Sequence, residues 1–381
     1  MINTADIVII GGGVHGASLA FHLAREKAGK IVLLEKKHMA AGPTAKSSAM
    51  IRPLFNELVY VQLVSESTKL FEQWGDYVGG SAGFVQNGFL RITDSLENDA
   101  LAGNLDLAKS QGVNFQIIPN DELKNYAPNG EFGEKEIAVL FTDGGYADPY
   151  LTTLSLAAAA KRLGAEIIEG VSVTGIKVSQ GRIDAVQTDA GEISTRTVIN
   201  CAGAWSDRIA AYAGVQLPIE VHRIPVCLFR RPLEMNIENP VYSDGTHGVY
   251  LRKADENIFR SGLFGSEKDP VDPDTYDETL SEDQLPVFRK PLDQRFAVMR
   301  KTYFTGGFSA VYDMSPDGHP IIGRIPEVDG FWCDCGWSGN GFASSPVIGR
   351  SLATEIMGGK SDIDISYFSW PRSQDVTDRR R

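Results

Sequence analysis

The sequence has no long apolar run, no excess of positive charge, and few cysteines and histidines. No apolar stretch approaches the ~18 residues that a membrane-spanning helix needs, so we expect no membrane span. The net charge of −12 over 381 residues argues against nucleic acid as a partner. The four cysteines lack C-x-x-C spacing and no two of the six histidines have metal-ligand spacing, which predicts free thiols and no metal site. Because the first strand follows Met1 almost directly, we expect no secretory leader and a cytoplasmic location.

A glycine-rich junction near the start of the chain is the strongest positive signal. A short apolar run ends at Gly11, and Gly13 and Gly16 follow as a helical pattern over residues 14–27 begins. This spacing is the dinucleotide-binding fingerprint. Gly11 permits a tight turn, Gly13 lets the backbone approach a pyrophosphate, and Gly16 lets the helix lie against the strand. The N–H groups at the start of the helix are then available to the phosphates.

An acidic residue follows at the position that recognises a ribose. A second apolar strand, residues 31–34, ends at Glu35. An acid about 20 residues beyond the glycines binds the hydroxyl pair of a ribose and repels a 2′-phosphate. The pattern therefore predicts a dinucleotide other than an NADP-type ligand. A βαβ unit that binds no nucleotide is the alternative.

The loop over residues 42–52 is rich in small and hydroxylated residues. Because it follows the ribose-binding acid, we expect it to pass along the ligand. The hydroxyls of Thr44, Ser47 and Ser48 are candidates to hydrogen-bond phosphate. Lys46 either adds positive charge there or is a solvated surface lysine.

Arg52, at the end of this loop, stands in an apolar context after Ala-Met-Ile. A lone charge in such surroundings is costly unless it is paired. Two interpretations stay open: the guanidinium forms an internal salt bridge, or it binds an anionic group of a substrate.

Further along, helical and strand patterns alternate. A long amphipathic helix is expected over residues 57–74, and strand-like alternation around a turn over 84–92 marks the start of a second domain. Residues 250–252 and 258–262 are expected to be adjacent strands of a large sheet. An acidic insertion follows them at 267–282.

Three junctions between loops and helices are also predicted. Asp148 and Pro149 have the residue types of a helix N-cap and first helical position. Residues 197–205 are expected to form a second strand–turn–helix junction that returns to the first sheet. A further glycine-rich turn at 336–341 is expected to open a helix over 345–357.

Taken together, these stretches resemble the D-amino-acid oxidase/sarcosine oxidase family of FAD-dependent amine-oxidising enzymes. Four stretches carry the resemblance in order along nearly the whole chain: 11–16 with Glu35, 143–149, 200–206, and 312–323 with 336–342. The last of them is most similar to the branch that oxidises sarcosine and dimethylglycine and to β-subunits of related dehydrogenases.

The resemblance implies an α/β fold with two domains. One is a Rossmann-like, discontinuous FAD-binding domain, and the other is a substrate-binding domain built on a mostly antiparallel sheet. The expected boundaries are 1–84, 141–215 and 308–371 for the first domain, 85–140 and 216–307 for the second, and 372–381 for a charged tail that frays.

The resemblance also implies FAD as the cofactor, held without a covalent bond. Some relatives tether the flavin through a cysteine where this chain has Ala310. Within the implied site, Glu35 holds the adenosine ribose, Val173 pairs with the adenine through its backbone, and the turn over 339–342 lies at the flavin ring. The expected cofactor-binding residues are Gly11, Gly13, Val14, His15, Gly16, Glu35, Lys36, Gly42, Thr44, Ala45, Ser47, Ser48, Val173, Ala202, Gly203, Trp205, Gly339, Asn340, Gly341 and Phe342.

On the substrate side, the resemblance assigns roles to two residues. Arg52 matches the carboxylate-binding arginine of the family, and Tyr312 matches a substrate-side tyrosine. Tyr250 and Tyr312 are expected to flank the amine, and ordinary packing within a sheet is the alternative for both. Arg252 or Arg260 is expected to assist Arg52.

Three positions depart from the sarcosine oxidases. Arg260 falls near the position of their oxygen-activating lysine, Ala343 replaces a second carboxylate-binding lysine, and Phe264 falls near a substrate-side histidine. These departures argue against sarcosine itself and against efficient use of O2.

The expected reaction is FAD-dependent oxidation of a secondary or N-methyl amine or an amino acid, by hydride transfer from the α carbon to flavin N5. The imine product then hydrolyses, and O2 or another acceptor takes the electrons. No Ser/His/Asp set or carboxylate pair is needed. The alternatives are a dye- or quinone-linked dehydrogenase subunit, a non-catalytic flavin-binding subunit of a complex, and an NAD-dependent dehydrogenase. Assembly with itself or with other chains is compatible with all of them.

Overall fold

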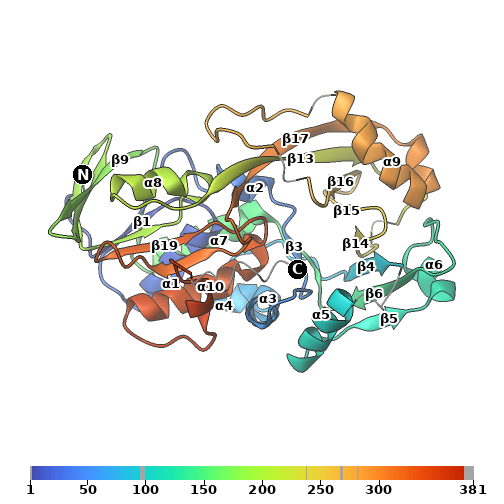
Figure 1. Ribbon diagram of the computed structural model, residues 1–381, viewed down its shortest axis with the longest axis horizontal. Coiled ribbons are helices and arrows are strands. Elements are labelled where there is room, and N and C mark those ends of the chain that lie inside the picture. Colours follow the sequence, from blue (N-terminus) through green and yellow to red (C-terminus); the bar gives the residue numbers. More distant parts are fainter. Residues whose placement is uncertain (1, 95–98, 237, 267–268, 281, 373–381) are drawn as a thin grey trace.

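The computed structural model describes residues 2–94, 99–236, 238–266, 269–280 and 282–372 (Figure 1). Residues 373–381 of the predicted fraying tail, and residues 267, 268 and 281 of the acidic insertion, lie outside the described residues. In the described ranges, no helix combines the length and apolar character needed to cross a membrane.

A mostly parallel sheet forms one half of the molecule. β1 pairs in parallel with β2 on one side and with β12 on the other, so the junction at 197–205 does return to the first sheet, as predicted. Only its edge strand β18 is antiparallel to its neighbour. The strand order is β18 (Ile321–Arg324), β19 (Phe331–Cys335), β12 (Thr197–Asn200), β1 (Ile7–Ile10), β2 (Ile31–Glu35) and β8 (Glu166–Glu169).

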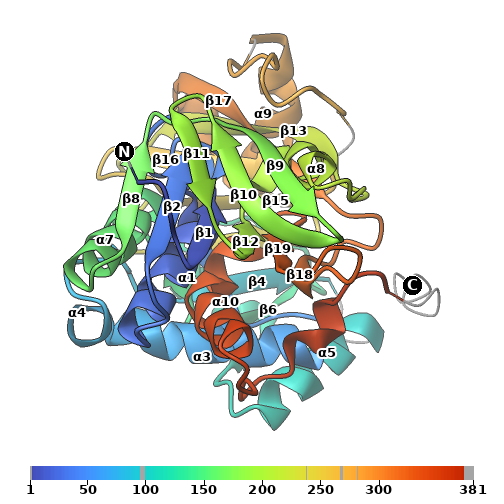
Figure 2. The ribbon, with the colours of Figure 1, turned by 90° about the vertical axis from the view of Figure 1, so that its left-hand side faces the viewer.

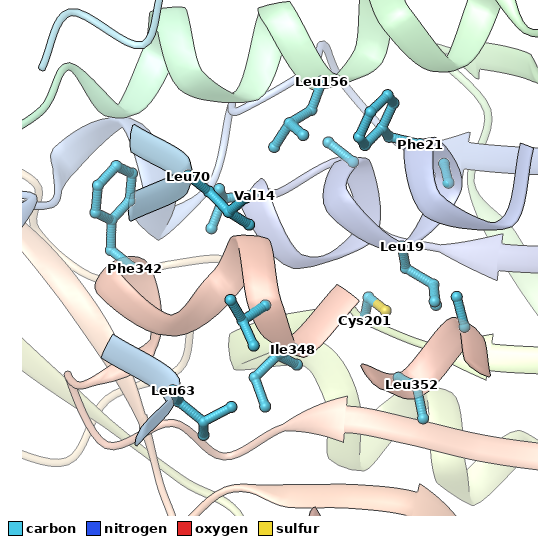
Figure 3. Close-up of a cluster of buried hydrophobic side chains, with 14 of the residues drawn as sticks. Val14, Leu19, Phe21, Leu63, Leu70, Leu156, Cys201, Phe342, Ile348 and Leu352 are labelled. Atoms are coloured by element: carbon cyan, nitrogen blue, oxygen red, sulfur yellow. The ribbon is translucent and has the colours of Figure 1, made fainter. Parts of the chain in front are cut away.

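Different elements cover the two faces of this sheet (Figure 2). Because side chains alternate along a strand, Ile7 and Ile9 of β1 face one core and Val8 and Ile10 face another. The first core includes α1 (Val14–Arg25), α3 (Leu58–Glu72), α7 (Pro149–Arg162) and α10 (Gly341–Ile356), whose side chains meet in Figure 3. The second includes α8 (Ser206–Tyr212) and the antiparallel strands β9 (Val173–Ser179), β10 (Arg182–Thr188) and β11 (Gly191–Ser194).

Helices α1 and α10 approach each other closely. Gly349 of α10 packs directly on Ser18 of α1, and a Cβ at Gly349 would lie 2.2 Å from the Ser18 hydroxyl oxygen. That hydroxyl also donates a hydrogen bond to the carbonyl of Pro346, at 3.4 Å. A larger residue at position 349 would therefore push the two helices apart.

Two predicted helix starts have different outcomes. The Asp148 prediction is confirmed: its Oδ1 accepts hydrogen bonds from the backbone N–H groups at the start of α7, and Pro149 is the first helical residue. The predicted start of α10 at residue 345 is wrong, because the helix already begins at Gly341 and includes Pro346. A proline inside a helix leaves a carbonyl without its N–H partner, and here Ser345 Oγ donates to the Phe342 carbonyl at 2.8 Å instead.

A second large sheet of eight strands forms the other half (Figure 1). One face packs on α9 (Leu285–Arg295) through a core that includes Phe229, Leu251 and Phe288. The predicted pairing of the strands around residues 250–252 and 258–262 is confirmed. The strand order is β17 (Phe304–Met314), β13 (Glu220–Arg230), β16 (Ile258–Leu263), β15 (Val249–Lys253), β14 (Val241–Asp244), β4 (Phe89–Thr93), β6 (Ile137–Phe141) and β5 (Gln116–Ile118).

Short elements connect the halves. Of the strands expected over residues 84–92, the structure forms only β4 as a regular strand. An isolated bridge between Val85 and Tyr146 precedes it. Beside it lies a two-stranded ladder, in which Met50 pairs with Tyr146 and Ile51 with Gly145. The remaining elements are β3 (Met50–Ile51), β7 (Gly145–Tyr146), α2 (Pro43–Lys46), α4 (Trp74–Tyr77), α5 (Asp99–Ser110) and α6 (Leu123–Tyr126).

Candidate active site

A cavity of about 410 Å³ opens at the carboxyl ends of β1, β2 and β12. Ligands of open parallel sheets bind at this edge, and the volume is typical of a small-molecule site. Many of the expected cofactor-binding residues line it: Gly11, Gly13, Val14, His15, Glu35, Lys36, Gly42, Thr44, Ser47, Val173, Ala202, Gly203, Trp205, Gly339, Gly341 and Phe342. Gly16, Ala45, Ser48 and Asn340 do not line it.

The glycine junction has the geometry that its spacing predicts. Gly11 adopts a φ of +113°, and a Cβ there would lie 2.3 Å from the carbonyl oxygen of Cys201. Gly16 lies against the same turn, where a Cβ would be 2.0 Å from the Gly11 carbonyl oxygen. Gly13 precedes the first residue of α1, and only the Thr44 hydroxyl is close to its Cα, 3.1 Å from a Cβ placed there. The N-terminus of α1 is thus open to the cavity, as an anion-binding site requires.

Glu35 is fixed at the cavity edge by two backbone groups. The N–H of Gly12 donates to its Oε2 at 2.7 Å, and the N–H of Lys37 donates to its Oε1 at 2.8 Å. A carboxylate has about four acceptor positions, so the side chain keeps capacity for a pair of ligand hydroxyls. Its orientation is preset by the glycine junction itself.

His15 contributes a polar atom that no residue of the fold satisfies. Its Nδ1 lies 3.1 Å from Asp334 Oδ2, and its ring stacks on Trp337 with centroids 4.5 Å apart. Trp337 Nε1 donates to the other oxygen of Asp334 at 2.8 Å. The remaining nitrogen, Nε2, is buried and has no hydrogen-bond partner among the described residues. Since His15 lines the cavity, a polar ligand group would satisfy this atom.

One end of the cavity is built by the turn before α10, where Gly341 packs against His15. Gly336 and Gly339 adopt φ values of +73° and +87°, and a Cβ at Gly339 would collide with the Tyr312 ring at 2.6 Å. Gly341, the first residue of α10, and Phe342 line the cavity. The positive end of the α10 dipole therefore lies at this end, where it favours negative charge on a ligand.

Arg52 reaches the same turn. Its Nη2 donates to Asn340 Oδ1 at 3.2 Å and its Nη1 to the Leu54 carbonyl at 2.9 Å. Both acceptors are uncharged, and the ion pairs found among the described residues do not include Arg52. Among the described residues, Arg52 therefore does not form the internal salt bridge that was one of the two interpretations of the sequence. Burial and the nearby Arg91 lower the pKa of Arg52 to about 10, against the opposing effect of Tyr312.

Tyr250 and Arg260 lie against the loop over residues 42–52. The Tyr250 hydroxyl lies 2.5 Å from Ser48 Oγ, and Arg260 Nη1 donates to the Ser47 carbonyl at 2.5 Å. Burial raises the pKa of Tyr250, so its phenol stays protonated at neutral pH. Ser47 lines the cavity, and these contacts bring the large sheet against the loop that borders it.

A segment that the sequence pattern did not assign to the site crosses the cavity. We call residues 269–280 the strap; Asp274, Tyr276 and Glu278 of it line the cavity. Lys36 Nζ pairs with Asp274 Oδ1 at 3.0 Å, and Lys46 Nζ pairs with Glu278 Oε2 at 2.8 Å. Lys46 is therefore neither a free surface lysine nor a purely ligand-directed charge. The sequence of the acidic insertion does not reveal these ion pairs, because the two lysines precede their acidic partners by more than 200 positions.

Comparison with known proteins identifies the family of the chain. A family model described as "FAD dependent oxidoreductase" matches residues 6–355. The chain belongs to this FAD-dependent oxidoreductase family. The resemblance stated from the sequence is confirmed, and FAD is the cofactor.

Individual relatives of the chain are found among protein sequences and among solved structures. It is 28% identical to mitochondrial sarcosine dehydrogenase of Mus musculus, over 100% of this chain and 42% of that protein, so it spans less than half of that relative. It is 24% identical to sarcosine oxidase subunit beta of Rhodobacter capsulatus, over 95% of this chain and 87% of that subunit. The solved L-proline dehydrogenase from P. horikoshii superposes with a TM-score of 0.89 at 27% identity, covering 97% of each chain.

The residues of this FAD-dependent oxidoreductase fit the cofactor. The open N-terminus of α1 suits a pyrophosphate, and the fixed Glu35 carboxylate suits the adenosine ribose. The buried His15 Nε2 has a position for a ligand partner that the protein alone does not fill. The chain would hold FAD through these groups, while the contact of each individual residue stays a prediction.

Proposed function

We propose that this chain oxidises a secondary or N-methyl amine or an amino acid that carries a carboxylate. The observation that carries the proposal is Arg52, a half-buried cation whose hydrogen bonds to the described residues go to uncharged oxygens and which lies beside Asn340 at the start of α10. A carboxylate offers the guanidinium the charge-assisted bidentate partner that it lacks. We also propose that the parallel-sheet half binds FAD and that the large sheet binds the substrate.

Bound FAD would supply the acceptor for the hydride that leaves the carbon beside the amine nitrogen. The chain's own contribution is positioning and exclusion of water. Arg52 fixes the carboxylate, and the Tyr312 ring, held against Gly339, bounds the space next to it. Buried Phe342 and Trp337 keep water away from the same end of the cavity. In a hydride transfer no side chain has to accept a proton from carbon.

Two further aspects belong to the proposal. We infer an electron acceptor other than O2, because Arg260 stands where the oxygen-activating lysine is expected. We also infer assembly with other chains, since a similar protein is named as a beta subunit. The cytoplasmic location stays a prediction.

The test is anaerobic bleaching of the protein-bound flavin. N-methyl amino acids, D-amino acids, proline and opines are mixed with the purified flavoprotein, and the visible spectrum reports reduction. We expect at least one to bleach the flavin, and Arg52→Met to raise its apparent dissociation constant by roughly 30- to 1,000-fold, or about 2–4 kcal/mol. Arg324→Met, which removes an exposed ion pair with Asp329, is the matched control. The proposal fails if no amine bleaches the flavin, or if Arg52→Met binds the amine as the parent does.

A further inference from the structure

The large sheet carries a second group of arginines on one face. Arg252 of β15 lies directly opposite Arg260 of β16 in the antiparallel register. Because side chains alternate along a strand, Arg252 shares its face with Tyr250, two residues before it. Like charges directly opposite each other on a sheet are destabilising. The repulsion between the two guanidinium groups must therefore be offset by groups that lie next to them.

Among the residues that the structure describes, neither arginine has a carboxylate partner. Arg252 is 6% exposed, donates to the Lys253 carbonyl and lies 4.6 Å over the Tyr146 ring. Arg260 donates to the Ser47 carbonyl and lies 5.1 Å over the Phe308 ring. The Nε atoms of both are buried without a hydrogen-bond partner among the described residues.

The surrounding charges do not neutralise the pair. Asp148 is the one acid that acts on both arginines, and its Oδ1 already caps α7 through two N–H groups. Burial and Arg260 lower the pKa of Arg252 to about 10. A buried and a half-buried cation that lie opposite each other, with no counter-ion assigned to them among the described residues, are costly. An anionic ligand between them would remove that cost.

The pair is connected to the proposed substrate site by a short segment of chain. Arg260 contacts Ser47, which lines the cavity, and Arg52 follows five residues later. That segment spans at most about 17 Å even when fully extended, which is an upper bound on the separation of the Ser47 and Arg52 backbones. The pair and Arg52 are thus connected through the single loop over residues 42–52.

We propose that Arg252 and Arg260 bind a second carboxylate, so that the substrate is a dicarboxylic amine or amino acid held by Arg52 at one end and by this pair at the other. The inference rests on the proposed function, because it assigns the second carboxylate to the same substrate. Two guanidinium groups provide enough donors to satisfy both oxygens of one carboxylate.

The test compares ligands that differ only in the second charge. Propionate, butyrate and valerate, and the dicarboxylates malonate, succinate and glutarate, are titrated into the purified flavoprotein, and the shift of the flavin spectrum gives each dissociation constant. We expect one dicarboxylate to bind at least tenfold tighter than the monocarboxylate of equal carbon number. Arg252→Met should abolish this preference because it weakens dicarboxylate binding more than monocarboxylate binding, and Arg252→Lys should restore part of the preference.

Each result separates the inference from the proposed function. If the parent protein shows no preference at any chain length, or if Arg252→Met weakens both ligand classes equally, the second subsite is refuted. The parent series alone decides this even if a variant does not fold. Arg324→Met should keep the full preference. If amines bleach the flavin while the preference is absent, the proposed function stands and only the dicarboxylate inference falls.

Discussion

Arg295 offers the sharpest test of what stabilises the large sheet. Its side chain is 1% exposed, and its guanidinium lies between two buried carboxylates. Nε donates to Asp244 Oδ2 at 2.7 Å, and Nη1 and Nη2 donate to the two oxygens of Glu136 at 2.8 and 2.6 Å. His247 Nδ1 lies 3.0 Å from Asp244 Oδ2. The acids and the imidazole alone would be a metal-ligand set, but here an arginine supplies the positive charge.

The size of the stabilisation by this ion-pair cluster follows from the pKa of Glu136. Burial raises the pKa of its carboxyl, but hydrogen bonds from Arg295 and neighbouring groups outweigh burial and hold the pKa at about 2, compared with 4.5 ordinarily. Each pKa unit corresponds to about 1.4 kcal/mol, so the carboxylate contributes about 3 kcal/mol. This agrees with the roughly 3–5 kcal/mol lost when one partner of a buried pair is removed. We therefore expect Arg295→Met to lower the free energy of unfolding by about 3–4 kcal/mol at neutral pH.

The pH dependence has a definite sign. Because the folded-state pKa of Glu136 is depressed, its stabilisation is complete above the ordinary pKa of 4.5 and is lost as the pH falls toward about 2. The gap in unfolding free energy between the parent and Arg295→Met should therefore narrow between about pH 5 and pH 3.

Urea unfolding followed by far-ultraviolet circular dichroism measures both effects. The matched control is again Arg324→Met, whose partner Asp329 is 2.6 Å away but exposed, so the expected loss is below about 1 kcal/mol. A loss below about 1 kcal/mol for Arg295→Met, or a gap that stays constant as the pH falls, would refute the reasoning.

Three further predictions concern the cofactor. Glu35→Gln replaces a carboxylate oxygen by a donor and should weaken FAD binding to the apoprotein about tenfold, measured by quenching of flavin fluorescence; unchanged affinity would contradict the ribose assignment. Gly13→Val projects a branched side chain beside Thr44 into the cavity and should give a colourless protein with an unchanged dichroism spectrum, whereas a yellow protein would contradict it. Lys46→Met removes the pair with Glu278 and should speed FAD release roughly three- to tenfold at low salt, measured by flavin fluorescence after dilution. High salt should speed FAD release from the parent more than from this variant. Equal effects of salt on the two proteins would contradict the prediction that the Lys46–Glu278 ion pair slows FAD release.

The features that the sequence predicts correctly are local ones. The turn at Gly11 and the cap at Asp148 depend on residues within a few positions of each other, so spacing alone specifies them. The start of α10 also depends on nearby residues, but it is not predicted correctly. Pro346 is tolerated inside the helix because the Ser345 side chain donates the hydrogen bond that the proline cannot donate to the Phe342 carbonyl. Composition does not show which hydroxyl makes such a bond.

The features that the sequence does not predict depend on strand register and on long-range contacts. Arg252 and Arg260 face each other only because β15 and β16 pair in one particular register, and a shift of one residue would turn one of them to the other face. Likewise, Lys46 meets Glu278 across a separation that no local pattern encodes. These are the contacts that shape the proposed substrate site, so its specificity is the part that requires the three-dimensional structure.

The packing of α1 on α10 has a consequence for a ligand that neither helix interior touches. The first helix begins at the glycine junction and the second begins beside Tyr312, and a Cβ at Gly341 would lie 2.7 Å from His15 Nε2, so the two N-termini converge on one part of the cavity. The contact of Gly349 with Ser18 holds the two helices in this arrangement. Two positive helix ends therefore act on the same region of a bound ligand. The small residues that bring them together lie inside the helical core and do not line the cavity.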